Sequence, residues 1–254
     1  MTFPFKVFIP ARFASSRLPG KPLLKIGTKP LVRHVYEAAA ESGAEEVVIV
    51  TDDDRIRIEA EGFGARVVMT STAHESGTER ISEAVVQGGE DESSIIVNVQ
   101  GDEFNLSPLL VKQVAESLHW DVQASVATLC EKITAMEDFH DPNVVKVVFD
   151  KDRHALYFSR AAIPVQQSSA TEEPTGFSHV PCRHIGIYAY RAAFLKIYAG
   201  LPACSLERSE RLEQLRVLYH GYSIRVDEAC TEGGIGVDTE ADLERARSAV
   251  NGEE

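Results

Sequence analysis

The chain has 254 residues, of which 44% are hydrophobic and 26% are charged, and its formal net charge is −13. This length and composition predict a globular protein with a substantial core. The acidic balance argues against a general binder of nucleic acid or of membrane surfaces, because such proteins need an extended basic face. The net negative charge is still compatible with a small anionic ligand that a local group of cations binds.

The cysteines and the apolar segments restrict the class of protein further. Cys130, Cys182, Cys204 and Cys230 are widely separated and form no C-x-x-C pair, so we expect reduced thiols rather than a zinc site or a disulfide framework. The N-terminal residues do not read as a secretory signal, and no stretch approaches the ~20 apolar residues that span a bilayer. We therefore expect a cytoplasmic protein without membrane insertion.

Apolar runs alternate with helical patterns in the first half of the chain. The predicted strands cover residues 5–10, 47–50, 67–69 and 95–99. The predicted helices cover residues 30–43, 53–61, 79–86 and 108–118. Strands that alternate with helices in this way predict an α/β fold, in which right-handed crossovers place helices on both faces of a mostly parallel sheet.

The second half departs from this alternation. Strands are predicted at residues 125–129, 144–149, 155–158, 185–190 and 224–226, without a full helix between each pair. The polar segment 165–180 reads as a loose loop, and residues 208–218 read as one helix. A last helix is expected over residues 239–250, with Thr239 as N-cap and Asp242 at N3. The simplest organisation is a single domain, residues 1–254, with two functional halves.

The first candidate site is the loop P-A-R-F-A-S-S-R-L-P-G-K-P, residues 10–22, which carries the cations Arg12, Arg17 and Lys21. The loop follows the first strand, at the sheet edge where open α/β folds bind ligands. It is not a Walker A motif, because Ser15 stands where that motif needs glycine, and its single glycine excludes G-x-G-x-x-G. Rigid cations suit a nucleotide triphosphate. A solvated basic loop would explain the same composition.

Two more segments add candidate ligands. Asp102 follows a predicted strand and Asp238 lies in G-V-D-T, and Mg²⁺ typically binds one or two carboxylates together with phosphate oxygens. Each aspartate alone reads more simply as a turn or cap residue. The segment H-E-S-G-T-E-R, residues 74–80, leads into a helix and suits an anion or a base. Ser76 and Glu79 also match a capping box, and both roles can coexist.

The order of the motifs is more specific than any one of them. The chain contains, in sequence, I-P-A-R-F-A-S-S-R-L-P-G-K-P-L, T-D-D, H-E-S-G-T-E-R, V-N-V-Q-G-D-E, N-V-V-K-V-V-F-D, A-L-Y-F-S-R-A-A-I-P, R-H-I-G-I-Y-A-Y-R, L-E-Q-L-R-V-L and G-V-D-T-E-A-D-L-E-R-A-R. Over about residues 5–247 it closely resembles the 3-deoxy-manno-octulosonate (Kdo) cytidylyltransferases, also called CMP-Kdo synthetases.

The resemblance implies a Rossmann-like nucleotide-diphospho-sugar transferase fold, with a mostly parallel sheet, helices on both faces and an additional small sheet and dimerisation region. It implies a nucleotide-binding half over about residues 1–120 and a sugar-binding and dimerisation half over about 121–254. It further implies a cytoplasmic homodimer that requires Mg²⁺ and transfers a cytidylyl group from CTP to Kdo for lipopolysaccharide biosynthesis. The products are CMP-Kdo and pyrophosphate.

Residue roles follow from the matching motifs. Catalytic roles fall to Arg12, Lys21, Asp102 and Asp238. The nucleotide would contact Ala11, Arg12, Arg17, Lys21, Ser76, Gly77 and Arg80. The sugar acid would contact Gln100, Arg160, His184, Tyr188, Glu213 and Gln214. Asp102 and Asp238 would be the metal ligands.

One departure and two alternatives accompany this interpretation. Phe104 and Asn105 stand where the family commonly has proline after G-D-E, so we expect a differently shaped loop beyond Asp102. A related acid sugar, 8-amino-Kdo or a sialic acid, is an alternative substrate. A non-catalytic nucleotide-binding protein on the same fold is the alternative from another functional class.

Overall fold

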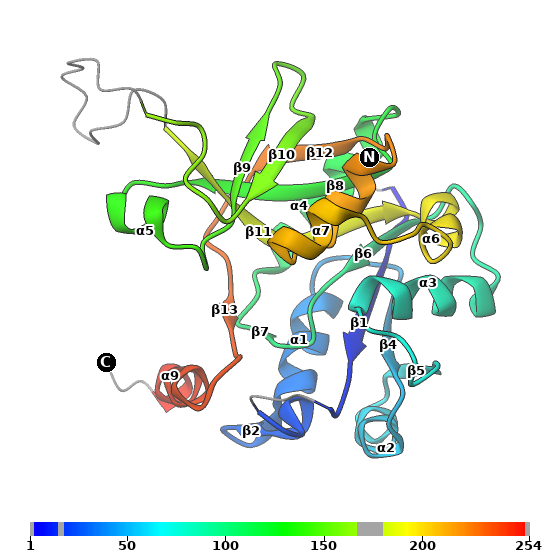
Figure 1. The fold of residues 1–254 in the computed structure, drawn as a ribbon. Helices are drawn as coiled ribbons and strands as arrows, with labels where there is room; N and C mark the ends of the chain where they lie inside the picture. Colours follow the sequence, from blue (N-terminus) through cyan, green and yellow to red (C-terminus); the bar gives the residue numbers. More distant parts are fainter. Residues whose placement is uncertain (1–2, 15–17, 167–179, 252–254) are drawn as a thin grey trace.

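The computed structural model describes residues 3–14, 18–166 and 180–251, and within them nine strands form one central sheet (Figure 1). Seven strands follow the order β10-β9-β11-β6-β1-β4-β5, while β8 pairs with β11 and β12. The bounds are β1 Lys6–Ala11, β4 Glu46–Thr51, β5 Arg66–Met69, β6 Ile95–Asn98, β8 Val126–Lys132, β9 Lys146–Phe149, β10 Ala155–Ser159, β11 Cys182–Arg191 and β12 Ile224–Glu228.

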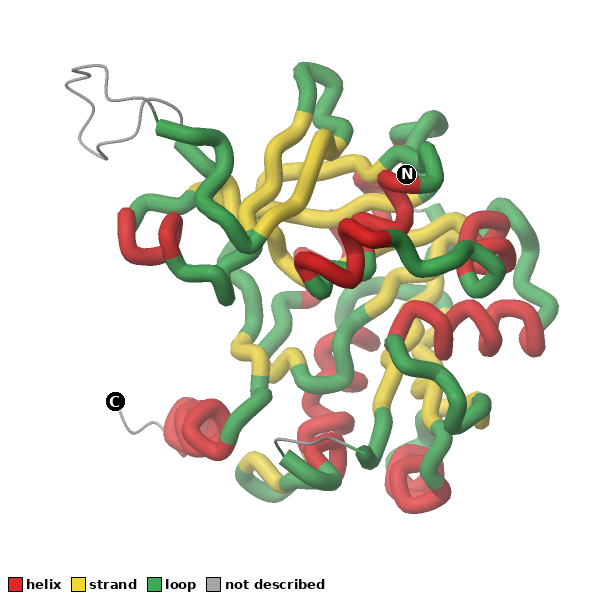
Figure 2. Tube along the Cα trace, viewed as in Figure 1, coloured by secondary structure: helices red, strands yellow, loops and turns green. Residues whose placement is uncertain are grey.

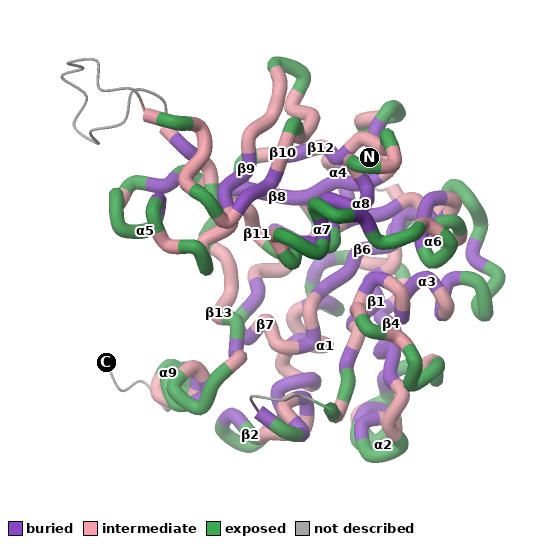
Figure 3. The backbone as a smooth tube through the Cα atoms, viewed as in Figure 1, coloured by how far each residue is buried: buried purple, intermediate pink, exposed green. Residues whose placement is uncertain are grey.

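The first-half strands β6, β1, β4 and β5 run parallel, with Lys6 in register with both Glu46 and Ile96. Most residues of β1, β4 and β6 are buried, as Figure 3 shows at the centre of the molecule. Continuous burial explains their unbroken apolar runs, because a parallel sheet is covered on both faces. The parallel α/β arrangement predicted from the sequence is confirmed.

Helices cover both faces of this sheet (Figures 1 and 2). Val7 and Ile9 of β1 pack in one core with apolar residues of four helices, α1 Leu31–Ala40, α2 Asp54–Gly62, α4 Pro108–Trp120 and α9 Glu240–Asn251. Phe8 points to the opposite face and packs with apolar residues of α3 Gly77–Gly88, α6 Ala192–Tyr198 and α8 Gln214–Tyr219. This alternation along β1 reflects the period of two in strands.

The second half is largely antiparallel, with the exception of β12, which runs parallel to β8. The ten-residue strand β11 pairs antiparallel with β6, β8 and β9, and β10 pairs antiparallel with β9. Two small antiparallel sheets lie beside the main one. One joins β7 Glu103–Phe104 to β13 Ile235–Gly236, and the other joins β2 Lys25–Ile26 to β3 Lys29–Pro30.

One predicted helix is wrong. Residues 208–218 form two helices, α7 Ser205–Glu210 and α8, separated by Arg211 to Glu213. Arg211 has φ 54°, a left-handed conformation that ends α7, and its N–H donates to the carbonyl of Glu207. Leu212 also donates to that carbonyl, at 3.3 Å. The chain therefore turns before α8 begins, which points Glu213 and Gln214 in directions that one continuous helix would not allow.

Several smaller expectations have clear outcomes. Thr239 and Asp242 cap α9 reciprocally, since Asp242 N donates to Thr239 Oγ1 at 3.3 Å and Thr239 N to Asp242 Oδ2 at 2.8 Å. All four cysteines are free. In the described part of the chain, no helix combines the length and the apolar character needed to cross a membrane. Most of the expected loop 165–180 lies outside the described residues, and the division into functional halves stays a prediction.

Short elements missing from the sequence prediction include η1 Lys21–Leu23, α5 Met136–His140 and α6. Each has seven residues or fewer, too few to show a clear hydrophobic period.

Candidate active site

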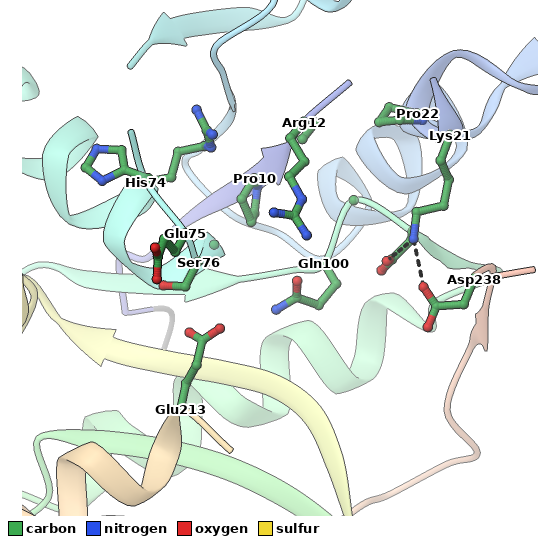
Figure 4. A pocket seen from close by; sticks show the side chains of 15 residues that line it. Pro10, Arg12, Lys21, Pro22, His74, Glu75, Ser76, Gln100, Glu213 and Asp238 are labelled. Carbon is green, nitrogen blue, oxygen red and sulfur yellow. Dashed lines mark hydrogen bonds and ion pairs between the residues drawn. The ribbon is translucent and has the colours of Figure 1, made fainter. Parts of the chain in front are cut away.

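A cavity of about 260 Å³ lies where β1, β6 and the start of α3 meet (Figure 4). Arg12 and Lys21 extend into it from one side, and Glu213 points toward it from the opposite side. Six residues predicted to contact the nucleotide line it together: Ala11, Arg12, Lys21, Ser76, Gly77 and Arg80. The seventh, Arg17, lies outside the described residues. We call this space the nucleotide cavity.

Lys21 joins the two predicted metal ligands within this cavity. Its ammonium lies 2.5 Å from Asp102 Oδ2 and 3.0 Å from Asp238 Oδ1 (Figure 4). The lysine side chain is only 12% exposed, so the pairs are partly shielded from water. The sequence placed all three residues at the site but gave no sign that one cation would bind both carboxylates.

The two aspartates, far apart in sequence, are held together by the small sheet of β7 and β13. Phe104 pairs with Ile235, and Val237 N donates to Asp102 O at 3.0 Å. The Phe104 side chain is buried and meets the His34 ring edge-on, with centroids 5.2 Å apart. Phe104 therefore anchors the segment that carries Asp102. Whether this loop differs in shape from that of relatives with proline stays a prediction.

Two glycines allow the strand ends to approach closely. A Cβ on Gly101 would lie 2.7 Å from the carbonyl oxygen of Pro10, closer than real Cβ atoms come. A Cβ on Gly77 would lie 3.1 Å from the Pro10 ring. Position 101 therefore requires glycine for the end of β6 to meet the end of β1, while at position 77 a side chain would make a tight contact with the Pro10 ring, and both close approaches shape the nucleotide cavity.

The start of α3 supports its side of the nucleotide cavity with two sets of contacts. Ser76 is the N-cap, and its hydroxyl accepts from Glu79 N at 3.2 Å, as the capping pattern predicts. Arg80 is buried, and its guanidinium donates to Asp52 at 2.7 Å and to the Thr70 hydroxyl at 2.7 Å. Capping and a place in the cavity therefore coexist at this helix end.

A second cavity of about 540 Å³ adjoins the first, and the two share Gly77, Gln100, Glu213 and Asp238. Five of the six residues predicted to contact the sugar acid line it: Gln100, Arg160, Tyr188, Glu213 and Gln214. Its other lining residues include Thr78, Tyr190, Tyr198 and Arg211. We call this space the sugar cavity. The side chains predicted to contact the nucleotide and those predicted to contact the sugar acid thus line two adjoining cavities with a common wall.

Glu213 stands in that common wall. The Thr78 hydroxyl donates to its Oε2 at 3.0 Å. Although Glu213 is exposed to the open cavities, the protein around them desolvates its carboxylate and raises its pKa. Glu213 is therefore readier than an ordinary surface glutamate to take up a proton and donate a hydrogen bond.

His184 is the sixth predicted sugar contact, and it is absent from the lining of both cavities. Its Nε2 lies 3.0 Å from the Thr128 hydroxyl, and its ring packs against Phe158 and Tyr188, each with centroids 5.2 Å away. Burial lowers the pKa of His184 to about 3, so the ring is neutral near pH 7. His184 supports Tyr188 in this structure, and a direct sugar contact stays a prediction.

Arg160 is fixed by backbone groups around the sugar cavity. Its Nε donates to the carbonyl of Glu210 at 2.8 Å and its Nη1 to that of Pro142 at 3.0 Å. Its own carbonyl accepts from the buried Lys146 ammonium at 2.7 Å. These contacts hold a positive charge at the cavity wall, as binding an acid sugar would require.

Sequence reasoning missed several residues of the site. Thr78 and Tyr190 lie inside quoted motifs, and the two-residue spacing of Tyr188 and Tyr190 on one strand could have indicated both tyrosines.

Glu103, beside Asp102, is also notable. Burial, together with the negative charges of Asp102 and Asp238, raises the pKa of Glu103 to about 7. That effect depends on the β7–β13 contact, which the sequence does not reveal.

Known proteins match this chain along most of its length. The cytidylyltransferase family model matches residues 7–225. The 3-deoxy-manno-octulosonate cytidylyltransferase of Thioalkalivibrio sulfidiphilus (strain HL-EbGR7) is 53% identical over 247 residues, which are 97% of this chain and 98% of the relative. The chain belongs to the 3-deoxy-manno-octulosonate cytidylyltransferase family. A family member from Nitrosococcus oceani is 51% identical over 251 residues, 97% of this chain and 96% of its own.

Solved structures agree with this membership of the Kdo cytidylyltransferase family. A CMP:2-keto-3-deoxy-manno-octonic acid synthetase complexed with CTP has a TM-score of 0.88 and 40% identity, covering 99% of this chain and all of that one. A nucleotidyl transferase from Methanothermobacter, at 15% identity and a TM-score of 0.63 over 99% of both chains, shares the fold. The resemblance and the fold class inferred from the sequence are both confirmed.

Proposed function

We propose that this chain transfers the cytidylyl group of CTP to 3-deoxy-manno-octulosonate, giving CMP-Kdo and pyrophosphate for lipopolysaccharide biosynthesis. The observation that carries the proposal is the pair of adjoining cavities with a common wall. One gathers cations and a helix N-terminus, as a nucleotide triphosphate requires, and the other gathers cations and polar side chains, as an acid sugar requires. The names of the close relatives and of the CTP-bound synthetase support the same reaction.

The reaction is an in-line displacement at phosphorus. The anomeric hydroxyl of Kdo loses its proton to solvent as its oxygen forms a bond to the α-phosphorus of CTP, the bond from that phosphorus to the bridging oxygen breaks, and pyrophosphate leaves. Because the sugar and nucleotide cavities meet at Gln100, Glu213 and Asp238, the attacking oxygen and the α-phosphate can approach each other there. Positioning supplies much of the rate enhancement in such reactions, and fixed charge supplies most of the rest.

Arg12 and Lys21 are the cations we assign to the CTP phosphates. Both line the nucleotide cavity, and Lys21 already sits among anionic oxygens there. For Lys21 to reach a phosphate, its contacts with Asp102 and Asp238 must loosen. We therefore propose that Lys21 exchanges carboxylate oxygens for phosphate oxygens when the substrate binds.

The donor set of Asp102 and Asp238 fits Mg²⁺. Two carboxylate oxygens that contact one ammonium are close enough to serve one small cation, and Mg²⁺ usually takes one or two carboxylates together with substrate phosphates and water. Among the described residues, no three His, Cys, Asp or Glu side chains form a metal cluster, so further ligands would come from CTP and water. When bound, the ion would supply Lewis-acid stabilisation of phosphate charge.

Sugar recognition falls to the second cavity. Arg160 and Arg211 are its cations, and one of them suits the carboxylate of Kdo. Tyr188, Tyr190 and Gln214 supply hydroxyl and amide groups for the sugar hydroxyls.

We further propose a homodimer in the cytoplasm, as in the family that the sequence resembles, and light scattering of the purified chain tests the dimer.

Pyrophosphate release tests the reaction directly. With CTP, Kdo and Mg²⁺ present we expect turnover, and omission of any one should abolish it. Asp102→Asn should lower turnover by about three orders of magnitude, because it weakens the carboxylate pair that would hold Mg²⁺ beside the reacting phosphate, whereas Asp138→Asn, at an exposed aspartate on α5, should not. Equal activity of the two variants would exclude Asp102 from the site. If turnover is faster with 8-amino-Kdo or with a sialic acid than with Kdo, that sugar and not Kdo is the substrate.

A further inference from the structure

Outside the groups already assigned to substrates, one buried ionic cluster connects the two cavities. Arg216, on α8, is buried and forms a two-pronged ion pair with Glu207 on α7, with Nε at 2.8 Å from Oε2 and Nη2 at 2.6 Å from Oε1. Its remaining nitrogen, Nη1, reaches Glu79 Oε1 on α3 at 3.3 Å. Its guanidinium also lies 5.0 Å from the centre of the Tyr198 ring on α6. Four helices therefore meet at one side chain.

The helices in this cluster carry residues of both cavities. Glu79 is in the first turn of α3, two residues after Gly77 and three after Ser76 of the nucleotide cavity. Arg216 is two residues after Gln214 and three after Glu213, which line the sugar cavity. A shift of α8 relative to α3 would therefore move sugar contacts relative to nucleotide contacts.

Burial of this cluster makes it a fixed rather than a fluctuating link. The side chains of Arg216 and Glu207 are 8% and 10% exposed, and that of Glu79 is 22% exposed. The hydrogen bonds that Arg216 donates to Glu207 are the main cause of its raised pKa. The guanidinium therefore stays charged. Breaking a buried pair leaves an uncompensated charge, which is far more costly than losing a surface pair.

We propose that Arg216 is a positioning residue that sets Glu213 and Gln214 at the sugar cavity relative to the start of α3 at the nucleotide cavity. Arginine is required because its planar fork points three nitrogens in fixed directions, so it can engage Glu207 and Glu79 at once. Lysine keeps the charge but has a single ammonium. This inference rests on the proposed function, since it concerns how Kdo is held beside CTP.

Arg216→Lys is the first test, with Arg208→Lys as a matched control on α7, where the exposed Arg208 donates to the carbonyl of Ala203. In Arg216→Lys we expect KM for Kdo to rise about tenfold while KM for CTP changes less than about twofold, because a small displacement of the sugar contacts weakens sugar binding selectively. Arg208→Lys should match the wild type. A merely structural role would lower the active fraction and leave both KM values unchanged, and that result would overturn the proposal.

Glu79→Gln provides a second test if Arg216→Lys fails to fold. Glu79 is partly exposed, so this variant should fold; it weakens the link from Arg216 and also the hydrogen bond that Glu79 Oε2 accepts from Glu75 N at 3.2 Å. We expect KM for Kdo to rise about threefold, because a neutral amide accepts a weaker hydrogen bond from arginine than a carboxylate does. An unchanged KM for Kdo in this variant would contradict a link through Glu79.

A readout independent of turnover separates this proposal from the proposed function. Amide hydrogen exchange over residues 213–219 should be about tenfold faster in Arg216→Lys than in Arg208→Lys, because local opening of α8 becomes easier. Absence of turnover with Kdo in the wild type would contradict the proposed function, while the exchange experiment would still test Arg216. Equal exchange in both variants would refute its positioning role.

Discussion

His184 gives a pH dependence of stability whose sign follows from the structure. Its pKa falls from 6.5 to about 3 on folding, and burial is the cause. Between these values the unfolded chain binds a proton that the folded chain does not, so the free energy of unfolding rises with pH in this window. The contribution is complete above the unfolded pKa of 6.5 and is lost as pH falls toward about 3. The protein should therefore lose stability on acidification through this residue.

The size of the effect between pH 7.5 and pH 5.5 depends on the unfolded state, because the folded ring stays neutral at both. Protonation of the unfolded histidine at pH 5.5 gives a loss of about 1.4 kcal/mol. For a chain of this length that corresponds to a fall in Tm of about 3–5 °C. His184→Gln removes the titrating ring and leaves a side-chain amide beside Thr128.

Thermal unfolding of both proteins at the two pH values provides the measurement. We expect the fall in Tm on acidification to be smaller in His184→Gln than in the wild type by about 3–5 °C. His140→Gln, at an exposed histidine at the end of α5, controls for the loss of any histidine and should behave like the wild type. An equal pH dependence in the wild type and His184→Gln would refute the assignment of a desolvated, neutral His184.

Three further substitutions test the architecture of the site. Gly101→Ala should lower kcat/KM by about two orders of magnitude, because its Cβ would meet the Pro10 carbonyl at 2.7 Å and displace the end of β6. Gly233→Ala, with open space at that position, should not, and equal losses would contradict this reasoning. Asp52→Asn should raise KM for CTP about tenfold through loss of the charged partner of Arg80, with KM for Kdo unchanged as the kinetic control. Phe104→Ala should lower the free energy of unfolding by about 3–5 kcal/mol in urea titrations, because its side chain is buried, and a change below about 1 kcal/mol would exclude the anchoring role.

The parallel half of the fold was predictable because its strands are buried on both faces. Their apolar runs are unbroken and the intervening helices are long, so the alternation is visible in the sequence. The structure accordingly brings the residues singled out at strand ends and at the N-terminus of α3 together around one cavity. The positions of Asp102 and Asp238 could be predicted, but their common contact with Lys21 could not. That contact depends on β7 and β13, which have only two residues each.

The break between α7 and α8 was hidden for a different reason. Leu212 and Leu215 are buried and three residues apart, a spacing that a single helix would also show. No glycine or proline marks the turn, and Arg211 takes the left-handed conformation that glycine usually supplies. The pair between Arg216 and Glu207 and the carbonyl contacts of Glu207 stabilise the turn. The ion pair joins two separate helices, so the spacing of apolar residues along the chain does not reveal it.

The contact between Lys21 and Asp238 spans 217 positions of the chain. Closing so long a loop costs conformational entropy that only the rest of the fold can offset. The carboxylate pair therefore depends on the rest of the fold, including the β7–β13 contact that holds its two segments together. During synthesis on the ribosome, a chain that has not yet released residue 238 can contain most of the nucleotide cavity but not its second carboxylate. The two-carboxylate site is therefore complete only when nearly the whole chain has been made.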